Sequence, residues 1–277
     1  MPVDLAAHPA PLPAQARTAA PRPARTPAAD AAPLLQAEGL VKRFGGLLAT
    51  DGLQLALAPG ETHALIGPNG AGKTTAMGLL TGELRPDAGR VLLDGRDVTR
   101  WSVARRARAG IARSYQITQL LPGFTVLENV MLVVQARAGA SFGAWTPVHR
   151  QPALTGPALA ALEQVGLAGR AHADVAALAH GEHRQLELAM ALALQPRVLL
   201  LDEPLAGMAQ GESERMVELL LQLKRRYAML LVEHDIDAVF RLADRVSVLV
   251  DGRAIASGAP AEVQADPAVR RAYLGQA

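Results

Sequence analysis

The sequence has no cysteine among its 277 residues, which excludes a disulfide framework and a metal site built on thiolates. Aromatic residues make up only 3% of the chain and hydrophobic residues 50%, so the core must consist mostly of Leu, Val and Ala. No apolar run approaches the roughly 20 residues that a membrane-spanning helix requires. A formal net charge of +2 gives no reason by itself to expect a nucleic-acid partner.

Residues 1–33 differ from the rest of the chain because they are mostly Ala and Pro with scattered arginines. Repeated proline prevents a continuous helix, and alanine offers little surface to bury. We therefore expect a disordered tail over residues 1–33 and an ordered domain over residues 34–277. The alternative is a basic arm that contacts anionic lipid or nucleic acid.

The most informative stretch follows the pattern G-x-x-x-x-G-K-[ST], which is typical of a phosphate-binding loop. It comprises Gly67, Pro68, Asn69, Gly70, Ala71, Gly72, Lys73, Thr74 and Thr75. The pattern predicts a short buried strand over residues 61–66 and a helix from Lys73 to Leu80 that ends near Gly82. Because the loop motif requires strand, loop and helix in this order, we predict a nucleotide site rather than a simple helix-capping turn.

Each part of this loop has a predicted chemical role. Its glycines allow backbone N–H groups to point at phosphate oxygens, and the positive end of the following helix adds to the attraction. Lys73 would reach the β- and γ-phosphates, and the Thr74 hydroxyl would bind Mg²⁺.

Polar side chains follow two further apolar stretches. Residues 197–201 predict a buried strand of a parallel sheet, and Asp202 and Glu203 stand at its carboxyl end, where open α/β sheets bind ligands. Asp202 can orient Mg²⁺ and its waters, and Glu203 can accept a proton from the attacking water. Residues 228–232 predict another strand, and His234 beyond it can contact the γ-phosphate and that water. The alternatives are an acidic helix cap and a structural histidine.

Other segments are read from local patterns. Strands are predicted over Leu35–Phe44 and Leu53–Leu57, and Phe44 either stacks on an adenine ring or packs in the core. The arginine-rich helix at 103–109 is interpreted as a solvated face, and a helix is expected near 157–165. Apolar residues spaced three and four apart predict an amphipathic helix with Met216, Leu219, Leu220 and Leu223 on one face.

A long Ala/Leu-rich helix is predicted to follow Ala179 and to stop before Pro196. Gly181 at its start can expose backbone N–H groups to an anion. Two histidines, His180 and His183, lie in the same turn, but no partner at metal-ligand spacing accompanies them, so we do not predict a metal site there.

Taken in order, these motifs resemble those of ABC-type ATPases from about Leu35 to the C-terminus. Residues 67–75 match the family's Walker A loop, Asp202 and Glu203 its Walker B pair, and His234 its switch histidine. Gln116 matches the Q-loop residue, for which the resemblance implies roles in catalysis and in binding Mg²⁺. Phe44 matches the aromatic residue that stacks on adenine, and residues 178–182 occupy the place of the signature motif.

The resemblance implies an α/β fold: a P-loop ABC ATPase core with an antiparallel β-subdomain and an inserted α-helical subdomain at about 117–195. Two ATP-binding subunits would enclose two ATP molecules with Mg²⁺, each site combining Walker A and B of one chain with the signature of the other. Transmembrane permease subunits would use this motion, and the chain would lie peripherally on the cytoplasmic face of the inner membrane. More narrowly, residues 111–116, 121–129 and 271–275 resemble ATP-binding subunits of branched-chain amino-acid importers.

Two departures concern contacts between subunits. Ala179 stands where the family has a signature serine, and the loop after Pro204 lacks the aspartate common in the family. Because alanine cannot donate a hydrogen bond, we expect a heterodimer with a second ATP-binding subunit rather than a homodimer.

Alternatives from other classes remain open. They are an ABC ATPase for another solute or lipid, an ABC ATPase that acts on nucleic acid, and a small-molecule P-loop kinase. ABC ATPases that act on nucleic acid usually carry two cassettes or a long coiled coil. This chain has one cassette and no sustained heptad repeat, so we expect no nucleic-acid partner. Gln116, His234 and the signature region would have no role in a kinase.

Overall fold

The computed structural model of the chain describes residues 32–114, 120–139 and 152–272. Most of the predicted tail lies outside these ranges, and so does Gln116. The predictions for those positions are therefore not addressed by the structure.

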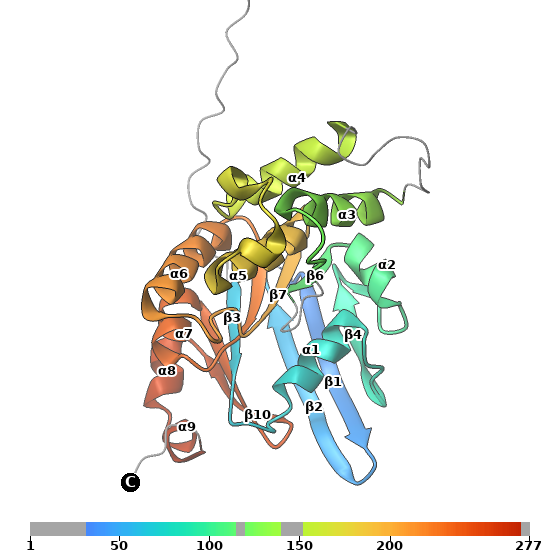
Figure 1. Ribbon diagram of the computed structural model, residues 1–277. Coiled ribbons are helices and arrows are strands. Elements are labelled where there is room, and N and C mark those ends of the chain that lie inside the picture. The colour runs from blue at the N-terminus through green and yellow to red at the C-terminus, as the bar shows by residue number, and fades with distance from the viewer. Residues whose placement is uncertain (1–31, 115–119, 140–151, 273–277) are drawn as a thin grey trace, which may run out of the picture.

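Two β-sheets form the framework (Figure 1). The antiparallel sheet has the order β2-β1-β4-β5, with β1 Leu35–Phe44, β2 Leu47–Leu57, β4 Ala88–Leu93 and β5 Arg96–Asp97. The larger sheet has the order β10-β9-β3-β8-β7-β6, with β3 Thr62–Ile66, β6 Ile111–Ser114, β7 Val198–Asp202, β8 Ala228–Val232, β9 Arg245–Val250 and β10 Arg253–Gly258. All its neighbouring strands are parallel except β9 and β10.

Helices cover both faces of the larger sheet because its central strands are apolar on both sides. They are α1 Lys73–Thr81, α2 Val103–Arg108, α3 Val126–Ala138, α4 Pro152–Gln164, α5 His180–Ala193, α6 Gln210–Lys224, α7 Ile236–Leu242, α8 Pro260–Ala265 and α9 Pro267–Ala272. Short 3₁₀ turns occupy Ala168–Arg170 and Val175–Ala177. Leu199 and Leu201 of β7 pack toward α3 to α6, whereas Val198 and Leu200 pack toward α1 and the antiparallel sheet.

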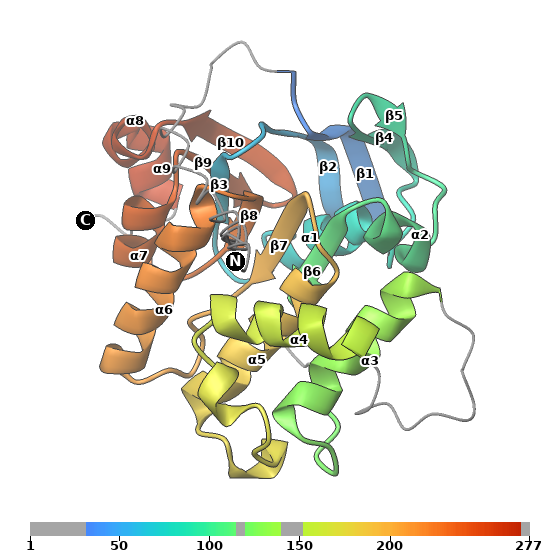
Figure 2. The same ribbon diagram turned by 90° about the horizontal axis from the view of Figure 1, so that it is seen from above.

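Figure 2 shows how these parts are arranged. The antiparallel sheet lies on one side of the central strands, α3, α4 and α5 lie together on another, and α6 and α7 flank the strands. The predicted fold class is confirmed: an α/β core carries an antiparallel sheet and a helical portion inserted between β6 and β7. The predicted amphipathic face of α6 is also confirmed, since Met216, Leu219, Leu220 and Leu223 are buried.

Two predicted boundaries are wrong. The strand expected at Leu53–Leu57 begins at Leu47, because residues 47–52 continue the antiparallel pairing with β1 up to the turn after Phe44. The helix expected near Pro157 begins at Pro152 and contains Pro157. Leu154 is buried with Ala158, Ala161 and Leu162 on the same helix face, so packing extends the helix upstream of its internal proline.

The interpretation of α2 as a solvated face is wrong at Arg106, whose residue surface is 1% exposed. Its guanidinium donates hydrogen bonds to the carbonyls of Leu79 and Leu80 at 2.7 Å each, and to that of Thr99 at 2.8 Å. The last carbonyls of a helix have no intrahelical partner, so Arg106 stabilises the C-terminal end of α1. Burial lowers the pKa of Arg106 to about 10, which leaves it charged at neutral pH.

We expect Arg106→Leu to lower the free energy of unfolding by about 3 kcal/mol or more, because it leaves buried carbonyls without their donor. Urea unfolding followed by circular dichroism measures this loss. Arg105→Leu is the matched control, since Arg105 is exposed on the same helix. Equal losses in the two variants would contradict the capping role.

His63 joins the two sheets. Its Nδ1 lies 3.0 Å from the carbonyl of Ala56 on β2, and its Nε2 lies 2.8 Å from Ser247 Oγ on β9. Burial lowers the pKa of His63 below its ordinary value, while the bond to Ala56 acts in the opposite direction. The folded chain therefore holds this imidazole neutral at a pH where the unfolded chain begins to protonate it.

The free energy of unfolding should consequently fall as the pH drops below about 6.5, because protons then bind preferentially to the unfolded chain. Melting temperatures measured between pH 8 and pH 5.5 test this expectation. His63→Gln removes the titrating group and should reduce this part of the pH dependence. An identical pH profile in His63→Gln would show that other groups cause it.

Candidate nucleotide site

The predicted strand, loop and helix are confirmed around residues 67–72. β3 is buried along its whole length, and α1 begins at Lys73. Gly67, Gly70 and Gly72 have φ angles of 153°, 81° and 102°. Residues other than glycine rarely adopt such backbone angles. A Cβ on Gly67 would lie 2.1 Å from the carbonyl oxygen of Leu249, so only glycine allows this close approach.

Lys73 lies across the loop. Its Nζ donates hydrogen bonds to the carbonyls of Gly67 at 2.7 Å and of Pro68 at 3.0 Å, and the residue is buried. Burial lowers the pKa of Lys73, and the carboxylates of Glu203 and Asp202 act in the opposite direction. The positive charge of Lys73 therefore lies close enough to the carboxylates of Asp202 and Glu203 to interact with them electrostatically.

The sheet register places the predicted polar groups at one edge. Leu65 of β3 is paired with Val232 of β8, and Val232 is paired with Asp202 of β7. The loop after β3, the two acids at the end of β7 and the residues after β8 consequently lie at the same edge of the sheet. This edge is the carboxyl end of parallel strands, where ligands bind in open α/β sheets.

Asp202 is only 3% exposed, and its carboxylate is paired with Arg113 of β6 at 2.6 Å. Arg113 also contacts Glu83 at 2.6 Å. Sequence reasoning assigned no role to Arg113, although it lies three residues before Gln116. A lone arginine in a predicted strand gives no local signal of a partner 89 residues away.

Glu203 and His234 meet across neighbouring strand ends. His234 Nε2 lies 2.9 Å from Glu203 Oε1, and the Glu203 N–H donates to the Val232 carbonyl at 2.8 Å. Glu203 has a φ of 50°, in the left-handed region that a glutamate rarely adopts. Such strain is typical of functional positions, and from this backbone conformation the Glu203 side chain contacts His234.

Glu233 is a second residue that sequence reasoning missed. It is buried and accepts hydrogen bonds from the N–H groups of Leu205 at 2.7 Å and His234 at 2.9 Å. Burial raises the pKa of Glu233, and these backbone donors act in the opposite direction. Glu233 thus links the loop after β7 to the backbone of His234.

Phe44 lies at the tip of the hairpin between β1 and β2, opposite Leu47. Its residue surface is 44% exposed, which excludes the alternative that it packs in the core. Lys42 Nζ lies 5.6 Å from the centre of the ring. Ala49 follows on β2, two residues after Leu47. A Cβ on Gly72 would lie 2.2 Å from the carbonyl oxygen of Ala49, so this hairpin packs directly against the phosphate loop.

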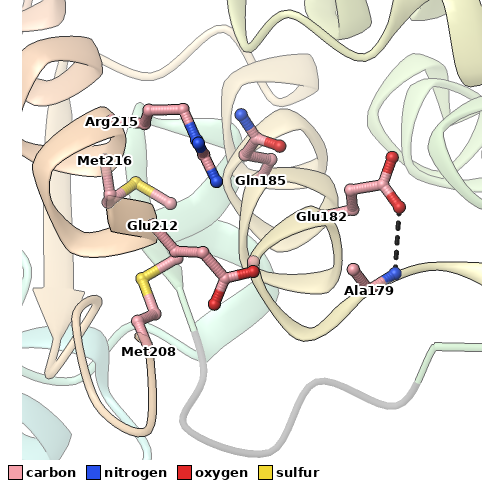
Figure 3. Close-up of a pocket in the computed structure, with 8 residues that line it drawn as sticks. Ala179, Glu182, Gln185, Met208, Glu212, Arg215 and Met216 are labelled. Atoms are coloured by element: carbon pink, nitrogen blue, oxygen red, sulfur yellow. Dashed lines mark hydrogen bonds between the residues drawn. The ribbon is translucent and has the colours of Figure 1, made fainter. Parts of the chain in front are cut away.

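A pocket of about 300 Å³ lies between the first turns of α5 and α6 (Figure 3). Ala179 and Gly181 border it together with Glu182, Gln185, Met208, Glu212, Arg215 and Met216. The Ala179 N–H donates to Glu182 Oε2 at 2.9 Å, the bond drawn in Figure 3. The start of α5 is therefore accessible, but one of its N–H groups already has a partner.

The neighbouring histidines have protein partners. His183 Nε2 lies 3.0 Å from the carbonyl of Val175, and His180 Nε2 lies 3.3 Å from that of Ala206. In the described part of the chain, no group of three or more His, Asp or Glu residues could hold a metal ion. A magnesium site bound largely through phosphates and waters needs no such group.

Comparison with known proteins identifies the family. Residues 50–206 match the family described as ABC transporter. The chain belongs to the ABC transporter family. Residues 255–277 of this ABC transporter chain also match the family described as branched-chain amino acid ATP-binding cassette transporter.

One relative and two solved structures show how far the similarity extends. The ABC transporter chain is 39% identical to the high-affinity branched-chain amino acid transport ATP-binding protein LivG of Escherichia coli K12, over 88% of its own length and 99% of LivG. It resembles the crystal structure of a nucleotide-free ATP-binding cassette from an ABC transporter, with a TM-score of 0.79 and 30% identity. The match covers 88% of this chain and 100% of that cassette. The crystal structure of the ADP conformation of the cassette MJ1267 gives a TM-score of 0.78 and 30% identity, over 88% of this chain and 99% of MJ1267.

Proposed function

We propose that this chain hydrolyses ATP to power the import of branched-chain or other hydrophobic amino acids. The observation that carries the proposal is similarity over nearly the whole length of LivG, together with the separate match of residues 255–277. No helix within the described ranges is long and apolar enough to cross a membrane. We place the chain at the cytoplasmic face of the inner membrane, bound to transmembrane permease subunits.

In this proposal the phosphate loop binds ATP through the N–H groups of Asn69, Gly70, Ala71, Gly72 and Thr75. Lys73 supplies the positive charge for the β- and γ-phosphates, and Phe44 stacks on the adenine ring from the hairpin beside the loop. Because catalysis of phosphoryl transfer consists mainly of positioning and charge stabilisation, this preformed loop contributes much of the rate.

Magnesium fits the donor set at this edge of the sheet. The hydroxyl of Thr74 and the carboxylate of Asp202 offer oxygen atoms, which magnesium prefers, and the resemblance adds the amide of Gln116, which lies outside the described residues. Bound magnesium would neutralise charge on the β- and γ-phosphate oxygens. The neighbouring carboxylate Glu203 would take a proton from the attacking water, and His234, 2.9 Å from Glu203, would hold that water and the γ-phosphate.

The permease is proposed to contact the segment from Gln116 to Glu128. In the described part of this segment, Leu121 and Phe124 are exposed, at 40% and 41% of their surfaces. Thr125 is the N-cap of α3: the Glu128 N–H donates to Thr125 Oγ1, and the Thr125 N–H donates to Glu128 Oε2, which orders the turn at the start of the helix. Exposed apolar side chains on an ordered turn suit a contact with another subunit.

Purification of the tagged chain from native membranes tests the function. We expect the permease subunits to co-purify, and we expect proteoliposomes containing the complex and internal ATP to accumulate leucine, isoleucine or valine. The complex carrying Glu203→Gln is the control for ATP-driven uptake. Uptake of a different solute class would replace the proposed cargo, and ATPase stimulation by DNA, RNA or ribosomes would favour the nucleic-acid alternative.

We further propose that the second ATP-binding subunit is a different chain. Ala179 stands at the start of α5, where a hydroxyl would donate to the γ-phosphate held by the partner. In a heterodimer, only the partner's Walker A would meet this weakened signature, while Lys73 and Glu203 would face an intact one. Gly181 and the N-terminal end of α5 would still attract the phosphate, so the weakening is partial.

Ala179→Ser should raise ATP affinity about tenfold at the partner's site only, because a hydrogen bond to a charged group becomes available. Nucleotide binding at each site of the assembled complex measures this, with the opposite site blocked by a Walker A substitution. Ala177→Ser adds a hydroxyl at an exposed position outside the helix start and serves as the control. A fully active homodimer of the unmodified chain would contradict the asymmetry.

A further inference from the structure

The carboxylate of Asp202 is held by a guanidinium group on the neighbouring strand. Arg113 Nη2 lies 2.6 Å from Asp202 Oδ2, and Arg113 Nη1 lies 2.6 Å from Glu83 Oε2. The side chains of Arg113 and Asp202 are 8% and 3% exposed, so solvent and salt screen their attraction little. Because a guanidinium donates in a fixed planar geometry and its other nitrogen is bound to Glu83, this bond restricts the rotation of the carboxylate.

The sheet register explains why these two side chains meet. Arg113 of β6 is paired with Leu200 of β7, and Asp202 lies two residues further along the same strand. Side chains two residues apart point to the same face, and Leu200 packs on the face that α1 covers. Glu83 follows directly after Gly82, the cap of α1. Arg113 therefore connects the end of α1 to the last residue of β7.

We infer that Arg113 is a positioning residue for the magnesium ion of the proposed nucleotide site. The inference rests on the function proposed above. With Oδ2 bound to Nη2, the Asp202 carboxylate presents its other oxygen in one direction, as a group that orients a metal-bound water must do. Partners of this kind, one shell outside the metal, typically change metal affinity by about 10- to 100-fold when they are lost.

A simpler role would be that of a counter-ion that only keeps a buried carboxylate compatible with the fold. The two roles predict different measurements. Loss of a mere counter-ion would change the free energy of unfolding, and because it frees negative charge on Asp202 it would leave the magnesium concentration needed for nucleotide binding unchanged or lower it. A positioning residue changes the magnesium concentration needed for tight nucleotide binding, even when its positive charge is kept.

The experiment uses the full chain and a fluorescent, non-hydrolysable ATP analogue. Binding is titrated against magnesium concentration and measured separately in EDTA, and melting temperatures are recorded for every variant. We expect Arg113→Lys and Arg113→Gln to raise the magnesium midpoint about 10-fold or more, with binding in EDTA unchanged. A lysine keeps the charge but lacks the planar pair of donors that bridges Glu83 and Asp202.

Glu83→Gln is the matched control, because it alters the other partner of Arg113 and leaves the bond to Asp202 in place. Its magnesium midpoint should equal that of the unmodified chain. An unchanged midpoint in Arg113→Lys would overturn the inference, as would failure of both Arg113 variants to fold while Glu83→Gln folds. If the unmodified chain bound the analogue without any magnesium dependence, the proposed function itself would be wrong.

Discussion

Replacing Lys73 by alanine is expected to abolish magnesium-dependent ATP hydrolysis and to leave the chain folded. The Lys73 ammonium lies across the loop, with Nζ bound to the carbonyls of Gly67 and Pro68. Without it, the negative charge on the β- and γ-phosphates would have no matching cation in a preformed loop. Turnover should fall at least about 1000-fold, since preorganised charge is commonly the largest catalytic contribution.

The fold should survive this change for an electrostatic reason. Burial lowers the pKa of Lys73, so the charged form is less favourable in the folded chain than in water. Removing the ammonium gives up the hydrogen bonds to the carbonyls of Gly67 and Pro68 but no strongly stabilising charge, so we expect a loss of about 1–3 kcal/mol that leaves the chain folded. Phosphate release and circular dichroism are measured together, and Lys224→Ala, a lysine on α6, is the matched control. Normal turnover in a folded Lys73→Ala protein would falsify the site assignment.

Glu203→Gln should separate nucleotide binding from hydrolysis. The amide keeps the shape of the side chain but cannot take a proton at neutral pH, so turnover should fall at least about 100-fold. ATP affinity should be retained, because the phosphate loop and Lys73 are unchanged. The ATP-bound dimer should also live longer, which size-exclusion chromatography with ATP can follow.

The geometry around Glu203 indicates that a glutamine would remove the proton acceptor without disturbing the local structure. A glutamine can still bond to His234 Nε2, which lies 2.9 Å from the present carboxylate oxygen. Because glutamine and glutamate have nearly the same shape, we expect the variant to keep the φ angle of 50° at this position. Glu214→Gln, at an exposed position on α6, controls for the loss of a carboxylate. Loss of ATP binding in Glu203→Gln would instead assign this residue to the metal site or to the fold.

Much of the nucleotide site could be read from contiguous residues. The glycines and Lys73 of the phosphate loop lie within nine positions of one another, so local spacing specifies strand, loop and helix. Asp202 and His234 follow uninterrupted apolar strands, and parallel strands align their carboxyl ends at one edge of a sheet. The structure confirms this alignment through the pairing of Leu65, Val232 and Asp202.

The order of several motifs determined the family and the fold class without any structure. Each motif alone could also be explained by a purely structural role, such as a helix cap or a structural histidine. Few protein families contain all of these motifs in this order. The amphipathic spacing of α6 was equally local, because a helix shows its buried face every three or four residues. Patterns of this kind need no knowledge of what the helix packs against.

Tertiary structure alone decided which charged residues are buried and with whom. Arg105, Arg106 and Arg108 look alike in sequence, yet only Arg106 turns inward to the carbonyls of Leu79 and Leu80. Arg113 meets Asp202 across 89 residues. Such contacts depend on how strands and helices are placed in space, and no short-range pattern of residue types encodes that placement. A buried arginine is favourable only where distant elements supply acceptors, so its role becomes visible only in the folded chain.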